Sequence, residues 1–326
     1  MEDKATIISI EIPTSDHTDF MLHFNQTKPL CVWLDWDDGS QRTTFSEEGL
    51  VKASHTYSEA GQYNITLFAV DEATIELVTI NEDIGYRDMV TSVIIGEDVT
   101  RINDFMFSGC NNLESVEFLC EQIEIGDYAF ANCISLESID LPVTNISKGC
   151  FFNCSSLKRV NLPEEGVSTF YTNAFYGCSQ LKTINLNKVY SIGDYAFHGC
   201  RKLSKIELAE GVHDIGTGAF DSCSSIRTIT IDGVLEIGDR AFCNCQSVLK
   251  VRIPENVKSI GDNAFYNCNF LTEMKILCNE PPILKGTQSL PANINFDIIV
   301  PDGLKHQYAE ATNWNLFIDK IKEESL

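Results

Sequence analysis

The chain has 326 residues, of which 47 are acidic and 24 basic, so its formal net charge is −23. This balance, without a cluster of Lys and Arg, argues against a nucleic-acid binder and against attraction to an anionic membrane surface. Apolar residues make up 44% of the chain, yet no apolar run approaches the ~18 residues that span a bilayer. The sequence therefore predicts a folded protein of about two domains without a membrane span.

The N-terminus is acidic, Met1-Glu2-Asp3-Lys4, and no hydrophobic core of a signal peptide follows it. Two alternatives stay open. Either the chain remains inside the cell, or an export signal was trimmed and replaced by Met1.

Residues 1–83 show the alternation of apolar and polar residues that indicates β-strands. Three such runs are Ile8–Ile12, Cys31–Trp36 and Tyr63–Val70. A turn signal, Asp37-Asp38-Gly39-Ser40, follows the second run. Short strands with polar turns predict a small antiparallel sandwich.

The sequence motifs of this region resemble those of a PKD-like domain. The resemblance rests on Trp36-Asp37-Asp38-Gly39-Ser40, His55-Thr56-Tyr57 and Gly61-Gln62-Tyr63, and Asp37 stands where that family often has Gly. It implies an Ig-like sandwich that serves as a spacer or interaction module without catalysis.

Asp35, Asp37 and Asp38 allow two interpretations. Several carboxylates could hold Ca²⁺, or their oxygens could bond local backbone N–H groups in a turn. The turn is favoured, because no EF-hand spacing or distal Glu completes a cage. His55 is interpreted as structural.

Residues 84–280 contain eight copies of one motif, Phe-x-x-Cys. The eight pairs are Phe107/Cys110, Phe130/Cys133, Phe151/Cys154, Phe175/Cys178, Phe197/Cys200, Phe220/Cys223, Phe242/Cys245 and Phe265/Cys268. Subtracting successive Phe numbers gives steps of 23, 21, 24, 22, 23, 22 and 23 residues. A period in the low twenties is typical of leucine-rich repeats, which stack into a solenoid. We expect the first coil to begin upstream, at Val93–Val99.

The slots of one unit have physical interpretations. Ile206 and Leu208 are two residues apart, so they point to the same face of a strand. Gly193 fits a tight turn that requires positive φ. In the seven units from Phe130 on, the slot before Phe holds only small residues, such as Ala196, or Cys150 in another unit.

The 13 cysteines are an odd number, and eight of them occupy the repeat slot. Three interpretations are possible: buried free thiols in a ladder, disulfides between neighbouring coils, and metal binding at Cys150/Cys154 or Cys243/Cys245. Free thiols are favoured, because ladder side chains run in parallel and the spacings are not those of a zinc ribbon.

The repeated phrase Ala-Phe-x-x-Cys resembles the BspA-like (Treponema-type) leucine-rich repeats, here in eight tandem matches. The resemblance implies a surface or secreted protein of bacteria or some protozoa, associated with adhesion to host proteins, cells or other microbes.

One residue between the Ile and Leu slots of each strand should point outward. These eight residues form the outward strip: Glu117, Asp140, Asn161, Asn185, Glu207, Thr230, Arg252 and Lys275. The strip starts acidic and ends basic. We hypothesise that it is the ligand surface, while an ordinary solvated face is the equal alternative.

Residues 281–326 predict a cap over the last coil. A strand-like run, Phe296–Pro301, precedes Leu304, Tyr308, Ala311 and Trp314 at helical spacing. Tyr308 and Trp314 are interpreted as core residues.

The predicted fold is therefore an all-β Ig-like (PKD-like) sandwich over 1–83, a leucine-rich-repeat β-solenoid-like array over 84–280 and a small α+β cap over 281–326. No nucleophile elbow, phosphate loop, metalloprotease motif or cofactor motif is present, so we predict a protein that is not an enzyme. The expected function is adhesion at the cell surface, with a protein or glycan on host or neighbouring cells as ligand. The alternative is a scaffold component of a cell-surface or phage-virion assembly.

Overall fold

The computed structural model describes residues 4–13, 18–80, 84–208, 210–291 and 295–324. The chain divides into two compact units. The N-terminal unit comprises Met1–Val143 and Ser147–Pro163, and the C-terminal unit comprises Thr144–Ile146 and Glu164–Leu326. Within the described ranges, none of the helices has the length and apolarity needed to cross a membrane.

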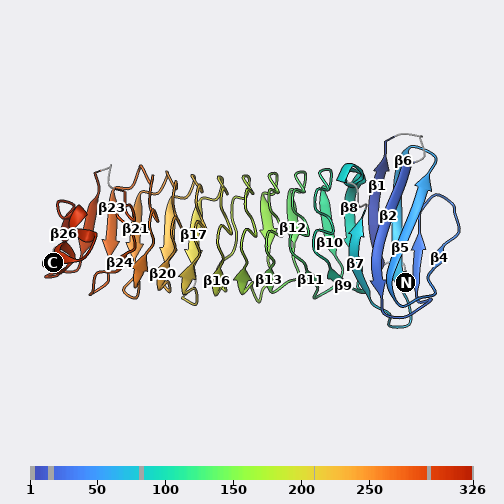
Figure 1. The fold of residues 1–326 in the computed structure, drawn as a ribbon, viewed down its shortest axis with the longest axis horizontal. Helices are drawn as coiled ribbons and strands as arrows, with labels where there is room; N and C mark the ends of the chain where they lie inside the picture. Colours follow the sequence, from blue (N-terminus) through green and yellow to red (C-terminus); the bar gives the residue numbers. More distant parts are fainter. Residues whose placement is uncertain (1–3, 14–17, 81–83, 209, 292–294, 325–326) are drawn as a thin grey trace. The chain divides into compact units, whose positions relative to one another are not determined.

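The N-terminal unit contains two large sheets (Figure 1). The six-stranded sheet has the order β10-β8-β1-β6-β3-β4 and is built from β1 (Thr6–Ile12), β3 (Val32–Asp35), β4 (Thr43–Thr44), β6 (Gly61–Ala69), β8 (Val90–Ile95) and β10 (Ser115–Phe118). The five-stranded sheet has the order β11-β9-β7-β2-β5 and is built from β2 (Thr18–Gln26), β5 (Gly49–Tyr57), β7 (Ile75–Ile80), β9 (Val99–Ile102) and β11 (Glu124–Ile125). The remaining elements of the unit are the 3₁₀ helix η2 (Ile84–Met89) and the paired strands β12 (Ser138–Asp140) and β14 (Arg159–Asn161).

The three strands predicted in residues 1–83 are confirmed as β1, β3 and β6. They lie side by side in one sheet, because β6 pairs antiparallel with both β1 and β3. Their inward residues are fully buried, as Ile8, Leu34 and Ile65 show. Strands β2, β5 and β7, which belong to the second sheet, were not predicted.

Both sheets continue without a break into the first repeats. β8 pairs antiparallel with β1 on one side and parallel with β10 on the other. In the second sheet, β9 pairs parallel with both β7 and β11. The expected upstream coil at Val93–Val99 is thus confirmed, since these residues fall in β8, β9 and the turn between them.

The C-terminal unit consists of parallel coils whose strands follow one another in chain order (Figure 1). One sheet contains seven two-residue strands: β13 (Asn145–Ile146), β15 (Thr169–Phe170), β16 (Ser191–Ile192), β18 (Asp214–Ile215), β20 (Glu236–Ile237), β22 (Ser259–Ile260) and β24 (Ile283–Leu284). A second row of strands comprises the pair β17 (Lys205–Leu208) and β19 (Thr228–Ile231), and the four-stranded sheet of β21 (Lys250–Ile253), β23 (Glu273–Ile276), β25 (Asp297–Val300) and β26 (Ile321–Glu323). The predicted solenoid is confirmed by these stacked parallel strands.

The repeated Phe residues stack ring on ring inside each unit. In the C-terminal unit, the rings of Phe197 and Phe220 lie 5.3 Å apart with an interplanar angle of 1°. In the N-terminal unit, Phe130 and Phe151 stack at 5.6 Å and 4°. All four side chains are fully buried. The sequence period therefore sets the core, because one ring per coil places each ring on the next.

The repeated cysteines are free thiols, as the favoured interpretation predicts. At least six of the eight also bond to the coil before them. For example, the Sγ of Cys223 donates to the carbonyl oxygen of Phe197 at 3.1 Å, and the Sγ of Cys268 donates to that of Phe242 at 3.3 Å. Burial raises the pKa of Cys268 to about 12. The slot therefore requires a small, apolar residue that still carries a weak donor.

The glycine of the repeat has a different role from the one predicted. Gly193 is not among the residues with positive φ. A Cβ at this position would instead meet the backbone nitrogen of Thr172, in the preceding coil, at 2.7 Å. The residue is glycine because the two coils approach too closely for a side chain.

Positive φ occurs at two other slots, two residues before and two residues after each Phe. The sixteen residues that share these slots are Phe105, Gly109, Tyr128, Asn132, Gly149, Asn153, Asn173, Gly177, Tyr195, Gly199, Gly218, Ser222, Arg240, Asn244, Asn263 and Asn267. In the second slot, seven of the eight residues are Gly or Asn and the eighth is Ser222, whereas the first slot also accepts aromatic rings. The ring of Tyr195 lies over Gly218, where a Cβ would meet it at 2.4 Å.

The C-terminal tail bonds to residues at the end of the repeat array, with one departure from prediction. The expected helix is split into α1 (Lys305–Glu310) and the 3₁₀ helix η3 (Trp314–Phe317), because Ala311 is extended and Asn313 is left-handed with φ 68°. Tyr308 and Trp314 are fully buried, so their prediction as core residues is confirmed. The Tyr308 hydroxyl donates to the Cys278 carbonyl and the Trp314 Nε1 to the Pro282 carbonyl, both at 2.7 Å.

Candidate binding surface

The outward strip lies on the strand rows of both units. In the N-terminal unit, Glu117 is in β10, Asp140 in β12 and Asn161 in β14, and all three are exposed. In the C-terminal unit, the strip residues in strands are Glu207 in β17, Thr230 in β19, Arg252 in β21 and Lys275 in β23. Asn185 is exposed but lies outside the strands.

Strand pairing brings the strip residues together in neighbouring pairs. Asp140 is paired with Asn161, and the Asn161 Nδ2 donates to the Asp140 Oδ1 at 2.6 Å. Glu207 is paired with Thr230, and Arg252 with Lys275. Six of the eight strip residues therefore lie in three adjacent pairs.

The two cations of the strip each contact a carboxylate. The Arg252 Nη1 lies 2.5 Å from the Asp232 Oδ1, and the Lys275 Nζ contacts the Glu324 Oε1. The side chains remain partly open to solvent, with 55% of Arg252 and 36% of Lys275 exposed. The basic end of the strip is thus held in place by acids that the strand pattern did not indicate.

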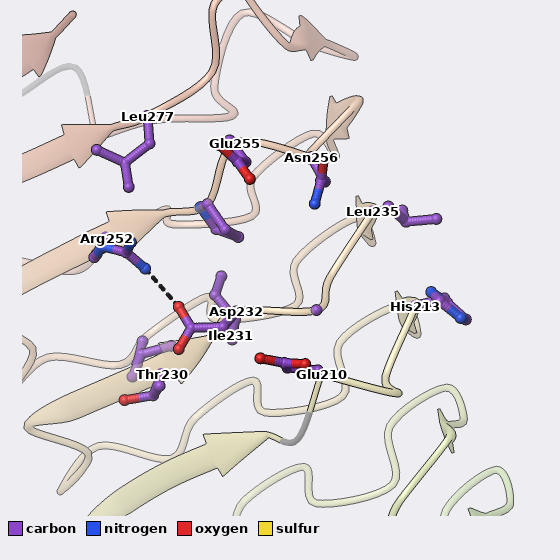
Figure 2. A pocket seen from close by; sticks show the side chains of 13 residues that line it. Glu210, His213, Thr230, Ile231, Asp232, Leu235, Arg252, Glu255, Asn256 and Leu277 are labelled. Carbon is purple, nitrogen blue, oxygen red and sulfur yellow. Dashed lines mark hydrogen bonds and ion pairs between the residues drawn. The ribbon is translucent and has the colours of Figure 1, made fainter.

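A groove of about 870 Å³ lies beside the strip in the C-terminal unit. Thr230 and Arg252 line it, together with the loops that follow β17, β19 and β21. Figure 2 shows the Arg252 and Asp232 side chains pointing toward one another, with Glu210 on the neighbouring loop. Two of the eight predicted residues therefore reach this groove.

The groove offers both apolar and hydrogen-bonding contacts. Ile231 and Pro254 are buried in its wall, and Leu277 is half-buried. Glu210 and Glu255 are exposed at its rim. Such a site can bind a polar ligand or an exposed peptide segment by surface complementarity.

Sequence reasoning missed the loop residues Glu210, Asp232 and Glu255. A usable signal was present, because each acid follows the last apolar residue of its strand by one or two positions: Leu208, Ile231 and Ile253. The alternation within the strands predicts only which residues lie on the sheet face, whereas the groove lies where the strands end.

The Asp35 and Asp38 carboxylates make local turn contacts, whereas the Asp37 Oδ2 accepts the backbone N–H of Asn64. The Asp35 Oδ1 accepts the backbone N–H of Asp37, and the Asp38 Oδ1 accepts that of Ser40, both at 3.0 Å. Hydrogen bonding from Ser40 lowers the pKa of Asp38 from 3.8 to about 2, and the nearby His55 acts in the same direction. His55 lies 2.7 Å from the Asp38 Oδ2 and stacks on Trp36, as expected for a structural His. No set of three or more His, Cys, Asp or Glu with metal-binding geometry occurs in the described part of the chain.

One buried charge was not predicted. Asp221 is 1% exposed and accepts hydrogen bonds from the Arg240 Nη2 at 2.8 Å and the Asn244 Nδ2 at 2.9 Å. His198 lies next to it, with its Nδ1 3.9 Å from the Asp221 Oδ2, and stacks on Tyr176. Burial lowers the pKa of His198. These contacts satisfy the Asp221 carboxylate, so the cluster is structural.

Several solved proteins are similar to this chain. A solved leucine-rich repeat protein from Bacteroides ovatus is similar, with 25% identity, a TM-score of 0.50 and coverage of 72% of this chain and 66% of that chain, just under two thirds. A leucine rich cell surface protein from Faecalibacterium prausnitzii shares 21% identity over 80% of this chain and 88% of that chain, with a TM-score of 0.36. Pneumococcal vaccine antigen PcpA shares 16% identity over 76% of this chain and 82% of that chain, with a TM-score of 0.35.

Among curated proteins, no significant match to the chain was found. The family described as BspA type Leucine rich repeat region (6 copies) matches residues 78–189 and 168–283, which together make up more than half of the chain. Neither this family nor the structures named above is described as an enzyme. The chain belongs to the BspA type leucine-rich-repeat family.

Proposed function

We propose that the protein is a non-catalytic adhesion protein of the cell surface or a secreted one, and that its solenoid binds a protein or a glycan. The observation that carries this proposal is that two strip residues, Thr230 and Arg252, line the groove in the C-terminal unit. Membership of the BspA type family supports a binding role. In this proposal, residues 1–83 form a PKD-like, Ig-like sandwich that acts as a spacer, 84–280 the binding array and 281–326 the cap.

The test uses the full chain, because β8 pairs with β1 and a cut at residues 83/84 would divide a sheet. Labelled protein is applied to extracellular-matrix proteins, to cells and to a glycan panel. Saturable binding to one of these is expected. With the protein folded, absence of binding throughout the panel would contradict adhesion and favour the scaffold role.

Variants then locate the binding surface. Arg252→Glu and Lys275→Glu reverse the strip cations, and Thr230→Arg fills the groove wall. Each should weaken the captured interaction by ~5-fold or more if these contacts lie at its centre. Lys202→Glu is the matched control, because Lys202 is exposed outside both strip and groove and the charge change is the same. If all four variants bind with the affinity of the parent protein, the binding surface lies elsewhere.

A further inference from the structure

A second groove, of about 550 Å³, lies on the outer face of the six-stranded sheet in the N-terminal unit. Its lining comes from five strands and from the turns next to them. It includes Glu117, a strip residue, and Asp35 and Asp37 of the turn motif. Residues that the sequence placed in two separate regions thus share one surface.

The strand register defines a row across this groove. Glu117 is paired with Ile94, Ile94 with Ile7, Ile7 with Thr66, and Thr66 with Asp35. Each step crosses one strand, so the two carboxylates at the ends are four strand spacings apart, or ~19 Å. Residues in register across neighbouring strands project from the same face of the sheet.

The centre of the row is apolar and its ends are acidic. Ile7 and Ile94 are half-buried on the sheet face, so part of each side chain is open to the groove. Asp35 pairs with Arg42 at 2.9 Å, and the Asp37 Oδ2 accepts the backbone N–H of Asn64 at 2.8 Å. Glu117 is exposed and, among the described residues, has no ion-pair partner.

The charge of the whole unit reinforces this local pattern. The N-terminal unit, residues 1–163 without 144–146, contains 27 acidic and 9 basic residues, a difference of −18. The C-terminal unit contains the other 20 acidic and 15 basic residues, a difference of −5. A field of this sign attracts cationic partners and accelerates their association.

We infer that this groove binds a protein segment in which two basic residues flank an apolar centre. An extended segment advances ~3.3 Å per residue, so ~19 Å corresponds to basic residues about six positions apart. The apolar side chains between them would cover Ile7 and Ile94. This surface is separate in residues and in unit from the groove at Arg252, and the inference goes beyond the adhesion proposed above.

The probe is a fluorescein-labelled twelve-residue peptide with two lysines six positions apart and alternating valine and threonine between them. Its binding to the full chain is followed by fluorescence anisotropy at low and at physiological salt. Glu117→Lys should weaken binding by ~5-fold or more, because it reverses the unpaired acid. Ile94→Ser should weaken it by ~3-fold or more without any change of charge.

Glu59→Lys is the matched control, since Glu59 is an exposed acid of the same unit outside the groove. Its affinity should stay within ~2-fold of the parent protein, and the two Glu→Lys variants should keep the parent melting temperature. Equal losses in Glu117→Lys and Glu59→Lys would overturn the inference, because attraction would then follow net charge alone. Absence of binding at low salt would overturn it as well. Arg252→Glu should leave this affinity unchanged, so failure here is distinguishable from failure of the adhesion proposal.

Discussion

The Oδ1 of Asp194 accepts the backbone N–H of Thr217 at 2.7 Å, and Thr217 occupies the same slot one coil later. The same bond joins Asp104 to Asp127 and Asp239 to Asp262, in each case at 2.8 Å. Part of the acidic surplus of the chain therefore has a structural role, since these carboxylates link one coil to the next.

Replacing Asp194 should show the strength of this link. Asp194→Ala leaves the Thr217 N–H without its acceptor and should lower the free energy of unfolding by about 1 kcal/mol. Asp194→Asn keeps an oxygen acceptor at the same place, so it should cost less than half as much. Urea unfolding followed by circular dichroism measures both, and equal losses would contradict the role of the hydrogen bond.

Gly193 should be intolerant of any side chain. Gly193→Ala places a Cβ 2.7 Å from the Thr172 nitrogen and should cost about 2 kcal/mol or more, because the backbone of the neighbouring coil must move. Gly303→Ala is the control, since it has positive φ but no atom within 4 Å. Its cost should be about 1 kcal/mol from backbone strain alone. A smaller loss for Gly193→Ala than for Gly303→Ala in thermal unfolding would contradict the close approach.

The ladder thiols should be unreactive in the folded protein. Eleven of the 13 cysteines are buried, and only Cys31 and Cys120 are half-buried. Burial raises the pKa of Cys154 and of Cys110 to about 12, so both stay protonated at neutral pH and lack the reactive thiolate. Titration with an aromatic disulfide reagent should modify at most two thiols in the native state and all 13 after denaturation. Rapid native modification of more than two would contradict the ladder.

His198 should make stability depend on pH. Burial lowers its pKa from the ordinary value of 6.5, so the unfolded chain takes up a proton at a higher pH than the folded chain does. The contribution of neutral His198 to the free energy of unfolding is therefore fully present above pH 6.5. It is lost as the pH falls through the lowered pKa of the folded state. His198→Phe keeps the stacking on Tyr176 and cannot be protonated. Its melting temperature should decline less than that of the parent protein between neutral and mildly acidic pH, and parallel curves would contradict this account.

The repeat could be predicted because each core position holds the same type of residue in successive coils. Each Phe stacks on the Phe of the next coil within a unit, so a one-residue pattern is enough to define packing. The role of Gly193 could not be read in the same way. Both positive φ and close backbone approach select glycine, and only the distance to Thr172 separates them.

The N-terminal region was harder, because its sheets pair strands that are distant in sequence. β2 has an alternation that could have predicted it, since Phe20, Leu22 and Phe24 are all fully buried. Its pairing with both β5 and β7 has no marker in the sequence. The same holds for the groove that joins Glu117 to Asp35, since only the register of four strand pairs brings these residues into one row.

The link from Asp194 to Thr217 also has a consequence for how such a chain changes in length. Donor and acceptor are separated by one full coil, so an insertion or deletion of a few residues shifts every later donor away from its acceptor. Gain or loss of a whole coil, 21 to 24 residues by the Phe spacing, restores the same partners. Unequal recombination between repeats can therefore lengthen or shorten the array while each remaining junction keeps its bonds, and the reach of the surface can evolve separately from its chemistry.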